Sequence, residues 1–367
     1  MAKKAKTVFV CQECGYESSQ WMGKCICGAW NSFVEEKILP TQEEDVRRRT
    51  SSTGGTVKPS KLSEVGSLDY DRMDTGIGEL NRVLGGGLVK GSLVLISGEP
   101  GIGKSTIIIQ TASNLAESGK TVLYVSGEES EEQIKMRADR VCSKIPQNLF
   151  VMAETNMENV EAAVQAMKPD FLIIDSIQTL YSSQLDSAPG SVSQVRMCGN
   201  QLMKLGKTGN IPIFIVAHVT KSGDLAGPKT VEHLVDCVLN FTGERDQELR
   251  ILRAYKNRFG TTSEIGAFRM EEKGLQEVTD ISATFLENSD ENTEGSVATA
   301  IYEGSRPVMF EIQALVSPAN IGFARRTSVG IDNTRLNMIL AVMEKIVGIP
   351  LVNQDVYVNV VGGIRPE

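Results

Sequence analysis

The sequence lacks long apolar runs, has few aromatic residues and contains only 2 histidines. No stretch approaches the roughly 18 consecutive apolar residues that a membrane-spanning helix requires, so we expect no contact with a membrane. The N-terminal residues MAKKAK are basic, but no apolar core follows them, which argues against a secretory signal. The 367 residues, of which 41% are hydrophobic, suffice for one large core and a smaller module.

Acidic residues outnumber basic residues, 46 to 38. The net charge is −8, which excludes a uniformly basic nucleic-acid-binding protein. A ring that threads DNA needs a basic surface only along its lumen, so the overall charge does not exclude DNA as a partner.

Cysteines are few but unevenly placed. Of the 7 cysteines, Cys11, Cys14, Cys25 and Cys27 form one cluster near the N-terminus. Thiolates in two close pairs are typical of a tetrahedral zinc site in the reducing cytoplasm; a reactive dithiol is the alternative. The second pair is C-x-C, one residue shorter than the usual C-x-x-C.

Composition divides the chain into segments. Residues 7–35 form the cysteine module, and 36–66 are polar and rich in Ser, Gly and Arg, which is typical of a flexible linker. Residues 67–280 alternate apolar strands with helical stretches, and 286–367 form a separate α+β module.

The central segment predicts an α/β fold whose mostly parallel sheet is covered by helices on both faces. The expected parallel strands are 92–97, 121–126, 149–152, 171–175 and 211–217, and the expected helices are 105–118, 130–140, 157–167 and 192–205. Four further strands, 238–241, 248–254, 264–270 and 275–278, are expected to extend the sheet in antiparallel fashion.

A phosphate-binding loop follows the first of these strands. The pattern G-x-x-x-x-G-K-S is formed by Gly98, Glu99, Pro100, Gly101, Ile102, Gly103, Lys104 and Ser105, with Thr106 next in the helix. Backbone N–H groups of such a loop cradle the phosphates of ATP, the lysine reaches the β- and γ-phosphates, and the serine hydroxyl ligates Mg²⁺.

Polar residues at other strand ends complete the predicted ATP site. Asp175 ends a buried strand and is expected to hold Mg²⁺; a helix cap is the alternative. Glu128, favoured over Glu129, is expected to orient the attacking water, although both fit a solvated helix start. His218 is interpreted as a sensor of the γ-phosphate, against a purely structural role.

Cations and mobile loops suggest how subunits and DNA are engaged. Lys256 and Arg258 in YKNRFG either are solvated or stabilise charge on the γ-phosphate of a neighbouring subunit. The loops 182–195 and 220–230 contain glycine and proline, and Lys221 and Lys229 in the second are candidates for contact with DNA phosphates.

The combination of motifs resembles the bacterial RadA (Sms) family of DNA-repair proteins over about residues 7–367. The resemblance rests on CQEC, WMGKC, CGAWNSF, TGIGELNRVLGGGLVKGSLVLISGEPGIGKST, LYVSGEES, DSIQT, HVTK and above all YKNRFG. It implies a RecA-like core between a zinc finger and a Lon-protease-like, non-proteolytic domain that ends early here.

The same resemblance implies a hexameric, DNA-dependent ATPase that acts on single-stranded DNA and branched recombination intermediates beside the RecA recombinase. The resemblance then implies the roles in binding nucleotide and Mg²⁺ and in activating water that are expected above for Lys104, Ser105, Asp175 and Glu128. It also places Lys256 and Arg258 in a functional signature motif and implies that the four clustered cysteines bind zinc. The alternative is an oligomeric switch like the circadian-clock ATPases, which share TGIGELNRVLGGG and do not act on DNA.

Overall fold

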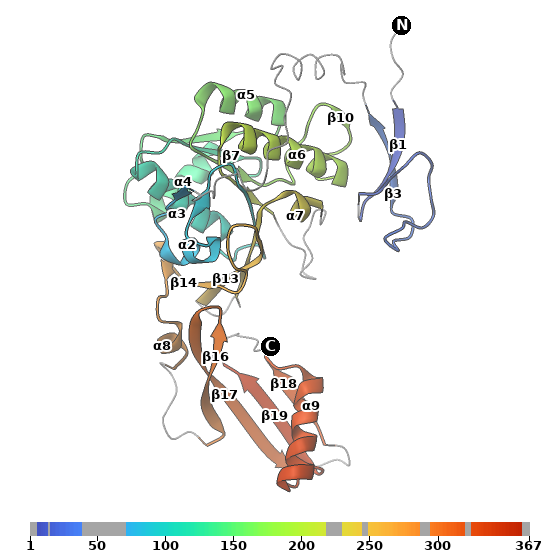
Figure 1. The fold of residues 1–367 in the computed structure, drawn as a ribbon, viewed down its shortest axis with the longest axis vertical. Helices are drawn as coiled ribbons and strands as arrows, with labels where there is room; N and C mark the ends of the chain where they lie inside the picture. Colours follow the sequence, from blue (N-terminus) through green and yellow to red (C-terminus); the bar gives the residue numbers. More distant parts are fainter. Residues whose placement is uncertain are drawn as a thin grey trace, which may run out of the picture.

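The computed structural model describes residues 6–13, 15–38, 71–217, 230–243, 249–286, 294–319 and 324–361. These residues are arranged around a four-stranded N-terminal sheet, a nine-stranded central sheet and a four-stranded C-terminal sheet. Figure 1 shows the N-terminal sheet beside helix α6 and the C-terminal sheet at the far end of the molecule. Within the described ranges no helix combines the length and apolar character needed to cross a membrane.

The central sheet has the strand order β15-β14-β13-β12-β6-β11-β9-β7-β8. Its parallel strands are β6 (Leu93–Gly98), β7 (Val122–Ser126), β8 (Leu149–Ala153), β9 (Phe171–Asp175), β11 (Ile213–Val216) and β12 (Cys237–Thr242). Its antiparallel extension consists of β13 (Leu249–Asn257), β14 (Ile265–Glu271) and β15 (Gly274–Glu277). The predicted α/β fold with a mostly parallel sheet is confirmed.

One expected strand direction is wrong. We expected residues 238–241 to be antiparallel, but β12 runs parallel to β6, with Cys237 opposite Val94. The reason is the short helix α7 (Thr230–Leu234), which precedes β12. It belongs to a crossover connection that returns the chain to the end of the sheet where β6 begins, so β12 runs in the same direction as β6.

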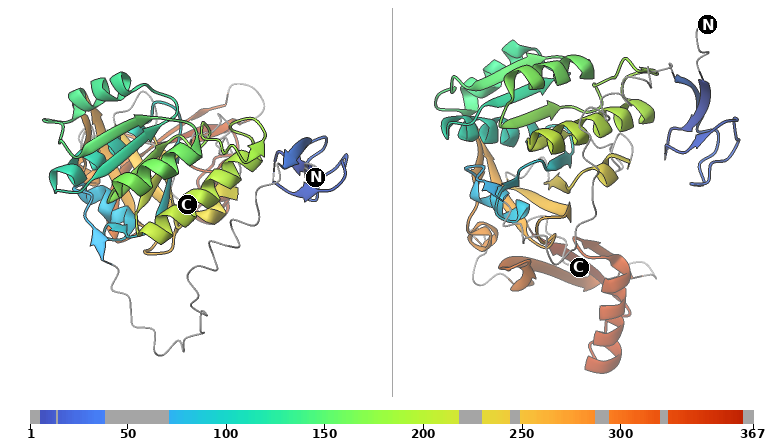
Figure 2. Two further views of the ribbon diagram at one scale, coloured as in Figure 1. Left: turned by 90° about the horizontal axis from the view of Figure 1, so that it is seen from above. Right: turned by 45° about the horizontal axis from the view of Figure 1, so that its top comes forward.

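Alternating side chains bury both faces of the sheet. Val94 and Ile96 of β6 point into one core, whereas Leu93 and Leu95 point into the other. The first core is closed by α2 (Gly78–Leu84), α3 (Lys104–Glu117) and α4 (Glu131–Val141), and the second by α5 (Met157–Met167) and α6 (Val192–Gly209). Figure 2 shows these helices on both sides of the strands.

The N-terminal sheet contains one strand from the core. Its own strands are β1 (Lys6–Cys11), β2 (Glu17–Ser18) and β3 (Phe33–Ile38). The fourth, β10 (Leu185–Asp186), pairs Leu185 with Ile38 and lies within the loop 182–195. Strand β3 runs beyond the predicted module end at residue 35, and most of the expected linker 36–66 lies outside the described residues.

The C-terminal sheet has the order β16-β17-β19-β18 and packs against the central sheet. Its elements are β16 (Ser296–Glu303), β17 (Arg306–Pro318), β18 (Arg326–Val329) and β19 (Gln354–Val360), with α9 (Asn333–Val342) continuing as a π-helical turn, Met343–Val347. Val308 and Phe310 of β17 share a core with Ile265 and Ala267 of β14. Helix α8 (Ile281–Leu286) links the two sheets. The short antiparallel strands β4 (Arg72–Met73) and β5 (Leu88–Val89), which are separated by α2, precede β6.

Candidate functional site

The phosphate-binding loop joins β6 to α3. Gly98, Gly101 and Gly103 have φ angles of 146°, 82° and 118°, a region that side chains rarely adopt. A Cβ at Gly98 would lie 2.8 Å from the carbonyl oxygen of Phe241. Helix α3 starts at Lys104 without a side-chain cap, so the loop leaves the N–H groups of its first turn for an anion. The cradle therefore fits a phosphate group.

Lys104 is enclosed by this loop. Its side chain is 4% exposed, and Nζ donates to the carbonyl oxygens of Gly98 and Glu99 at 2.7 and 2.9 Å. Burial lowers the pKa of Lys104, and the nearby carboxylates of Asp175, Glu128 and Glu99 partly counter that shift. The cation is thus desolvated beside the phosphate cradle.

Ser105 and Asp175 converge from α3 and β9. The Ser105 hydroxyl donates to Oδ2 of Asp175 at 3.1 Å, and Asp175 is 7% exposed. A hydroxyl and a carboxylate oxygen at this spacing are ligands suited to Mg²⁺. The structure therefore brings together the two residues that the sequence predicted as a pair.

Tyr124 is a site residue that the sequence analysis missed. Its hydroxyl donates to the same Oδ2 of Asp175 at 2.6 Å. Burial, with the Asp175 charge adding to it, raises the pKa of Tyr124 well above its ordinary value. A tyrosine inside the aliphatic strand TVLYVS was the available signal, because a buried hydroxyl needs a partner.

Glu128 and Glu129 have different surroundings. Ser176, directly after Asp175, donates its hydroxyl to Oε1 of Glu128 at 2.5 Å. Glu129 instead forms a two-contact ion pair with Arg137 of α4, in which Nη1 lies 2.7 Å from Oε2. Glu128 is thus linked to the residue that follows Asp175, whereas Glu129 is paired with α4. This geometry favours Glu128 over Glu129 for the predicted role.

Lys256 and Arg258 lie at the end of the sheet opposite the phosphate loop. The Arg258 N–H donates to the carbonyl oxygen of Asp236 at 3.0 Å, and Oδ2 of Asp236 accepts the N–H of Leu93 at 3.1 Å. Leu93 begins β6 and Gly98 ends it, a separation of about 16 Å along a strand. Neither cation is therefore positioned beside its own chain's phosphate loop.

The two cations differ in their contacts. Nζ of Lys256 donates to the carbonyl oxygens of Glu232 and Val235, each at 2.7 Å, and its pKa is lowered by burial and by Arg258. Arg258 is 53% exposed and lies 3.2 Å from Oδ1 of Asp236. A bulge in the β12–β13 ladder lies beside Lys256 and alters the direction of the side chains there. Arg258 is thus the cation that remains accessible to a second subunit.

Three of the predicted features fall partly or wholly outside the residues that the structure describes. His218, Cys14 and residues 220–229 lie outside the described ranges. The loop 182–195 is described, and the side-chain amide of buried Gln194 donates to the carbonyl oxygens of Ser182, Leu185 and Ser187. The predicted loop is therefore only partly a loop: its residues from Val192 on belong to α6, Gln194 holds the preceding residues by hydrogen bonds, and its segment β10 pairs with β3 of the N-terminal sheet.

Three cysteines of the N-terminal module form a candidate metal site. The Sγ atoms of Cys11, Cys25 and Cys27 all lie within 4.8 Å of one another, and those of Cys11 and Cys27 are 3.9 Å apart. Tetrahedral Zn–S bonds require sulfur atoms roughly 3.8 Å apart. Gly15 and Gly28 have φ angles of 72° and 96° and form the turns expected beside the cysteines. The donor set therefore suits zinc despite the short second pair.

Two family models match the parts of the chain that hold these sites. Residues 56–224 match the AAA domain family, and residues 9–35 match the rubredoxin metal binding domain family. The KaiC-like protein PH0186 from Pyrococcus horikoshii superposes with a TM-score of 0.48 at 18% identity, covering 57% of this chain and 99% of that one.

Curated relatives match nearly the whole chain. DNA repair protein RadA from Bacillus subtilis is 53% identical over 99% of this chain and 79% of its own length. The RadA protein of Halalkalibacterium halodurans is 52% identical over 100% of this chain and 79% of its own length. The chain is therefore an ATP-hydrolysing enzyme with a RecA-like fold that belongs to the DNA repair protein RadA family.

Proposed function

We propose that this protein is a DNA-dependent ATPase of recombinational repair, in which ATP hydrolysis drives translocation on single-stranded DNA and branch migration of recombination intermediates. Family membership supports the repair role. The observation that carries the mechanism is the separation of Arg258 from its own phosphate loop, by about 16 Å along β6. This position favours action on the ATP of an adjacent subunit over action on the chain's own ATP.

Each residue of the ATP site has a proposed role. The loop Gly98–Ser105 cradles the phosphates, and Lys104 contacts the β- and γ-phosphates. Ser105 and Asp175 would hold Mg²⁺, and the bound ion would neutralise charge that develops on the phosphate oxygens. Glu128 orients the attacking water, and His218 senses the γ-phosphate.

The neighbouring subunit completes the site. In this proposal Arg258 contacts the γ-phosphate held by the adjacent phosphate loop and Lys256 adds positive charge from the same segment, so both stabilise charge in the transition state. Such a contact is heterologous and forms a ring when its rotation closes; we propose a closed homo-hexamer. Hydrolysis then changes the subunit contacts, and Lys221 and Lys229 in the loop 220–230, with the loop 182–195, move the DNA strand.

The remaining assignments follow the same family. We propose a cytoplasmic protein that works beside the RecA recombinase, with a zinc finger at residues 7–35, a linker at 36–66, a RecA-like domain at 67–280 and a Lon-protease-like domain from residue 286. The distance of 3.9 Å between the Sγ atoms of Cys11 and Cys27 supports zinc binding by these two residues together with Cys14 and Cys25.

The test is the ATPase rate of the full chain with and without single-stranded DNA, repeated between about 50 and 200 mM salt. We expect DNA to raise the rate and salt to reduce the stimulation steeply, because binding to phosphates releases counterions. A rate that is the same with and without DNA at every salt concentration would favour an oligomeric switch that does not act on DNA.

A further inference from the structure

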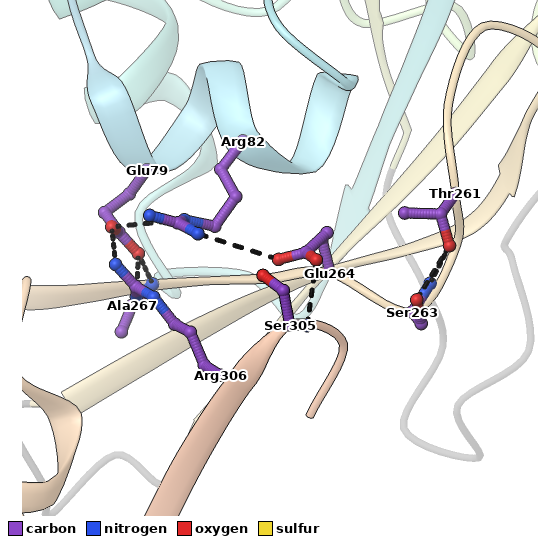
Figure 3. Close-up of polar contacts among 8 residues, drawn as sticks. All are labelled: Glu79, Arg82, Thr261, Ser263, Glu264, Ala267, Ser305 and Arg306. Carbon is purple, nitrogen blue, oxygen red and sulfur yellow. Dashed lines mark hydrogen bonds and ion pairs between the residues drawn. The ribbon is translucent and has the colours of Figure 1, made fainter. Parts of the chain in front are cut away.

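A buried ion pair joins the ATPase core to the C-terminal sheet. Nη1 and Nη2 of Arg306 lie 2.8 and 2.7 Å from Oε2 and Oε1 of Glu79 (Figure 3). The side chains of Glu79 and Arg306 are 3% and 16% exposed, and Oε2 of Glu79 also accepts the N–H of Ala267 at 3.1 Å. Because both oxygens face both guanidinium nitrogens, the pair sets an orientation as well as a distance.

The turn of the β16–β17 hairpin makes a second contact beside this pair. The N–H of Ser305 donates to Oε1 of Glu264 at 2.9 Å (Figure 3). Gly304 has a φ angle of 63°, and a Cβ there would lie 2.8 Å from the carbonyl oxygen of Ser263. The hairpin turn therefore contacts Ser263 and Glu264, which lie between YKNRFG and β14.

The other end of helix α2 supports YKNRFG itself. Nδ2 of Asn257 donates to the carbonyl oxygen of Val83 at 3.2 Å. A Cβ added to Gly85, directly after the helix, would lie 3.0 Å from Cα of Gly260. Helix α2 has 7 residues and spans about 10 Å, so it connects Glu79 at its start directly to Val83 near its end.

Helix α2 is also clamped along its length. A Cβ at Gly266 of β14 would lie 2.7 Å from the carbonyl oxygen of Glu79. The N–H of Glu79 donates to Oε1 of Glu277 in β15 at 2.6 Å. With β14 and β15 so close, α2 has little freedom to shift without moving its partners.

We infer that Glu79 and Arg306 are positioning residues for the trans-acting cations Lys256 and Arg258. Arg306 holds the start of α2, and the end of α2 holds the segment that carries both cations. The placement of the C-terminal sheet in the ring thereby sets how Arg258 is presented to the neighbouring ATP. This inference rests on the proposed function of Lys256 and Arg258.

The first experiment compares Arg306→Met and Arg306→Lys with Arg335→Met, an exposed arginine at the start of α9. All are measured in the full chain, by binding of a fluorescent ATP analogue and by steady-state ATP hydrolysis. We expect Arg306→Met to bind the analogue normally and to lose about 10- to 100-fold in kcat, because small displacements of a catalytic group are costly. Arg306→Lys keeps the positive charge but cannot form both hydrogen bonds, so we expect a smaller loss of kcat. We expect Arg335→Met to keep the wild-type kcat.

The second experiment separates positioning from a general structural defect. Each Arg306 variant is mixed with an equal amount of Lys104→Ala, which lacks its own ATP site but carries an intact YKNRFG segment. About a quarter of the interfaces then join an intact phosphate loop to intact cations, so turnover recovers toward that fraction. Absence of recovery would overturn the inference, because it would locate the defect in the variant's own ATP site.

The outcomes distinguish failure of the positioning role of Arg306 from failure of the proposed trans role of Lys256 and Arg258. If Arg258→Ala keeps the wild-type kcat, the trans role of the cations fails. If Arg258→Ala loses turnover while Arg306→Met and Arg306→Lys keep it, only the positioning role fails. Should Arg306→Met not fold, as circular dichroism would show, the same comparisons with Arg306→Lys and Glu79→Gln decide the question.

Discussion

The hydroxyl group of Tyr124 donates a hydrogen bond to Oδ2 of Asp175 at 2.6 Å, the oxygen that also accepts the Ser105 hydroxyl. Tyr124 is 1% exposed, and its raised pKa keeps it protonated throughout the neutral range. It therefore remains a donor and holds the Asp175 carboxylate in one orientation. Removing a group that orients a metal-ligating side chain by a hydrogen bond typically lowers metal affinity or activity about 10- to 100-fold.

Replacing Tyr124 with Phe should weaken the response to Mg²⁺. Without the hydroxyl, Oδ2 of Asp175 loses a partner, and we expect the Mg²⁺ concentration for half-maximal ATPase activity to rise about 10-fold. The measurement is a Mg²⁺ titration at fixed ATP. Tyr357→Phe in β19 removes a hydroxyl far along the chain and should leave the titration unchanged. An unaltered midpoint for Tyr124→Phe would refute this role.

Glu128 and Glu129 should respond differently to the same change. We expect Glu128→Gln to lower kcat about 10²- to 10⁴-fold with ATP binding intact, because the amide cannot accept a proton from water. Glu129→Gln removes an ion pair with Arg137 that is partly open to solvent, so we expect a stability loss of less than about 1 kcal/mol and a nearly normal kcat. The reverse pattern in single-turnover kinetics would transfer the catalytic role to Glu129.

Arg258→Ala and Lys104→Ala should each abolish turnover, for opposite reasons. Lys104→Ala loses its contact to the phosphates, whereas Arg258→Ala binds ATP but cannot assist its neighbour. Mixed in equal amounts, the two inactive proteins should recover up to about a quarter of the wild-type rate. A mixture as inactive as its components would mean that Arg258 acts within its own subunit or only in folding.

Zinc content tests the cysteine module. The close approach of Cys11, Cys25 and Cys27 leads us to expect one zinc ion per chain, measured by a colorimetric chelator after unfolding. Cys27→Ser should lower the retained zinc, whereas Cys142→Ser, which changes a cysteine of the central domain, should not. Equal zinc in wild type and Cys27→Ser would show that this short pair does not contribute its second thiol.

Because two thiols are buried, we expect the free energy of unfolding to fall at alkaline pH. Burial raises the pKa of Cys198 and of Cys237 from 9.0 to about 12. Between these values the unfolded chain releases the protons and the folded chain retains them, so both thiols lower the free energy of unfolding as pH rises. Urea unfolding at pH 8, 9.5 and 10.5 should show a shallower decline for the double variant Cys198→Ala, Cys237→Ala than for wild type. Parallel declines would contradict these shifts.

Local sequence determined the elements and the chemistry of the ATP site. Gly98–Ser105 needs only a strand before it and a helix after it, and both signals lie within a few residues. Continuous apolar runs such as Phe171–Asp175 likewise identify buried strands directly. The direction of β12 was missed because the 5-residue helix α7 is too short to produce a helical period in the sequence.

Only the tertiary structure decided which distant groups meet. Tyr124 reaches Asp175 because β7 and β9 are adjacent, with Ser126 opposite Asp175. Arg258 lies away from its own phosphate loop because β13 runs antiparallel to β12 and returns the chain to the end of the sheet where β6 begins. Glu79 and Arg306 are 227 residues apart in the chain. Periodicity and motif spacing record local geometry, whereas such contacts depend on how strands are ordered and how sheets pack, which no short segment of sequence contains.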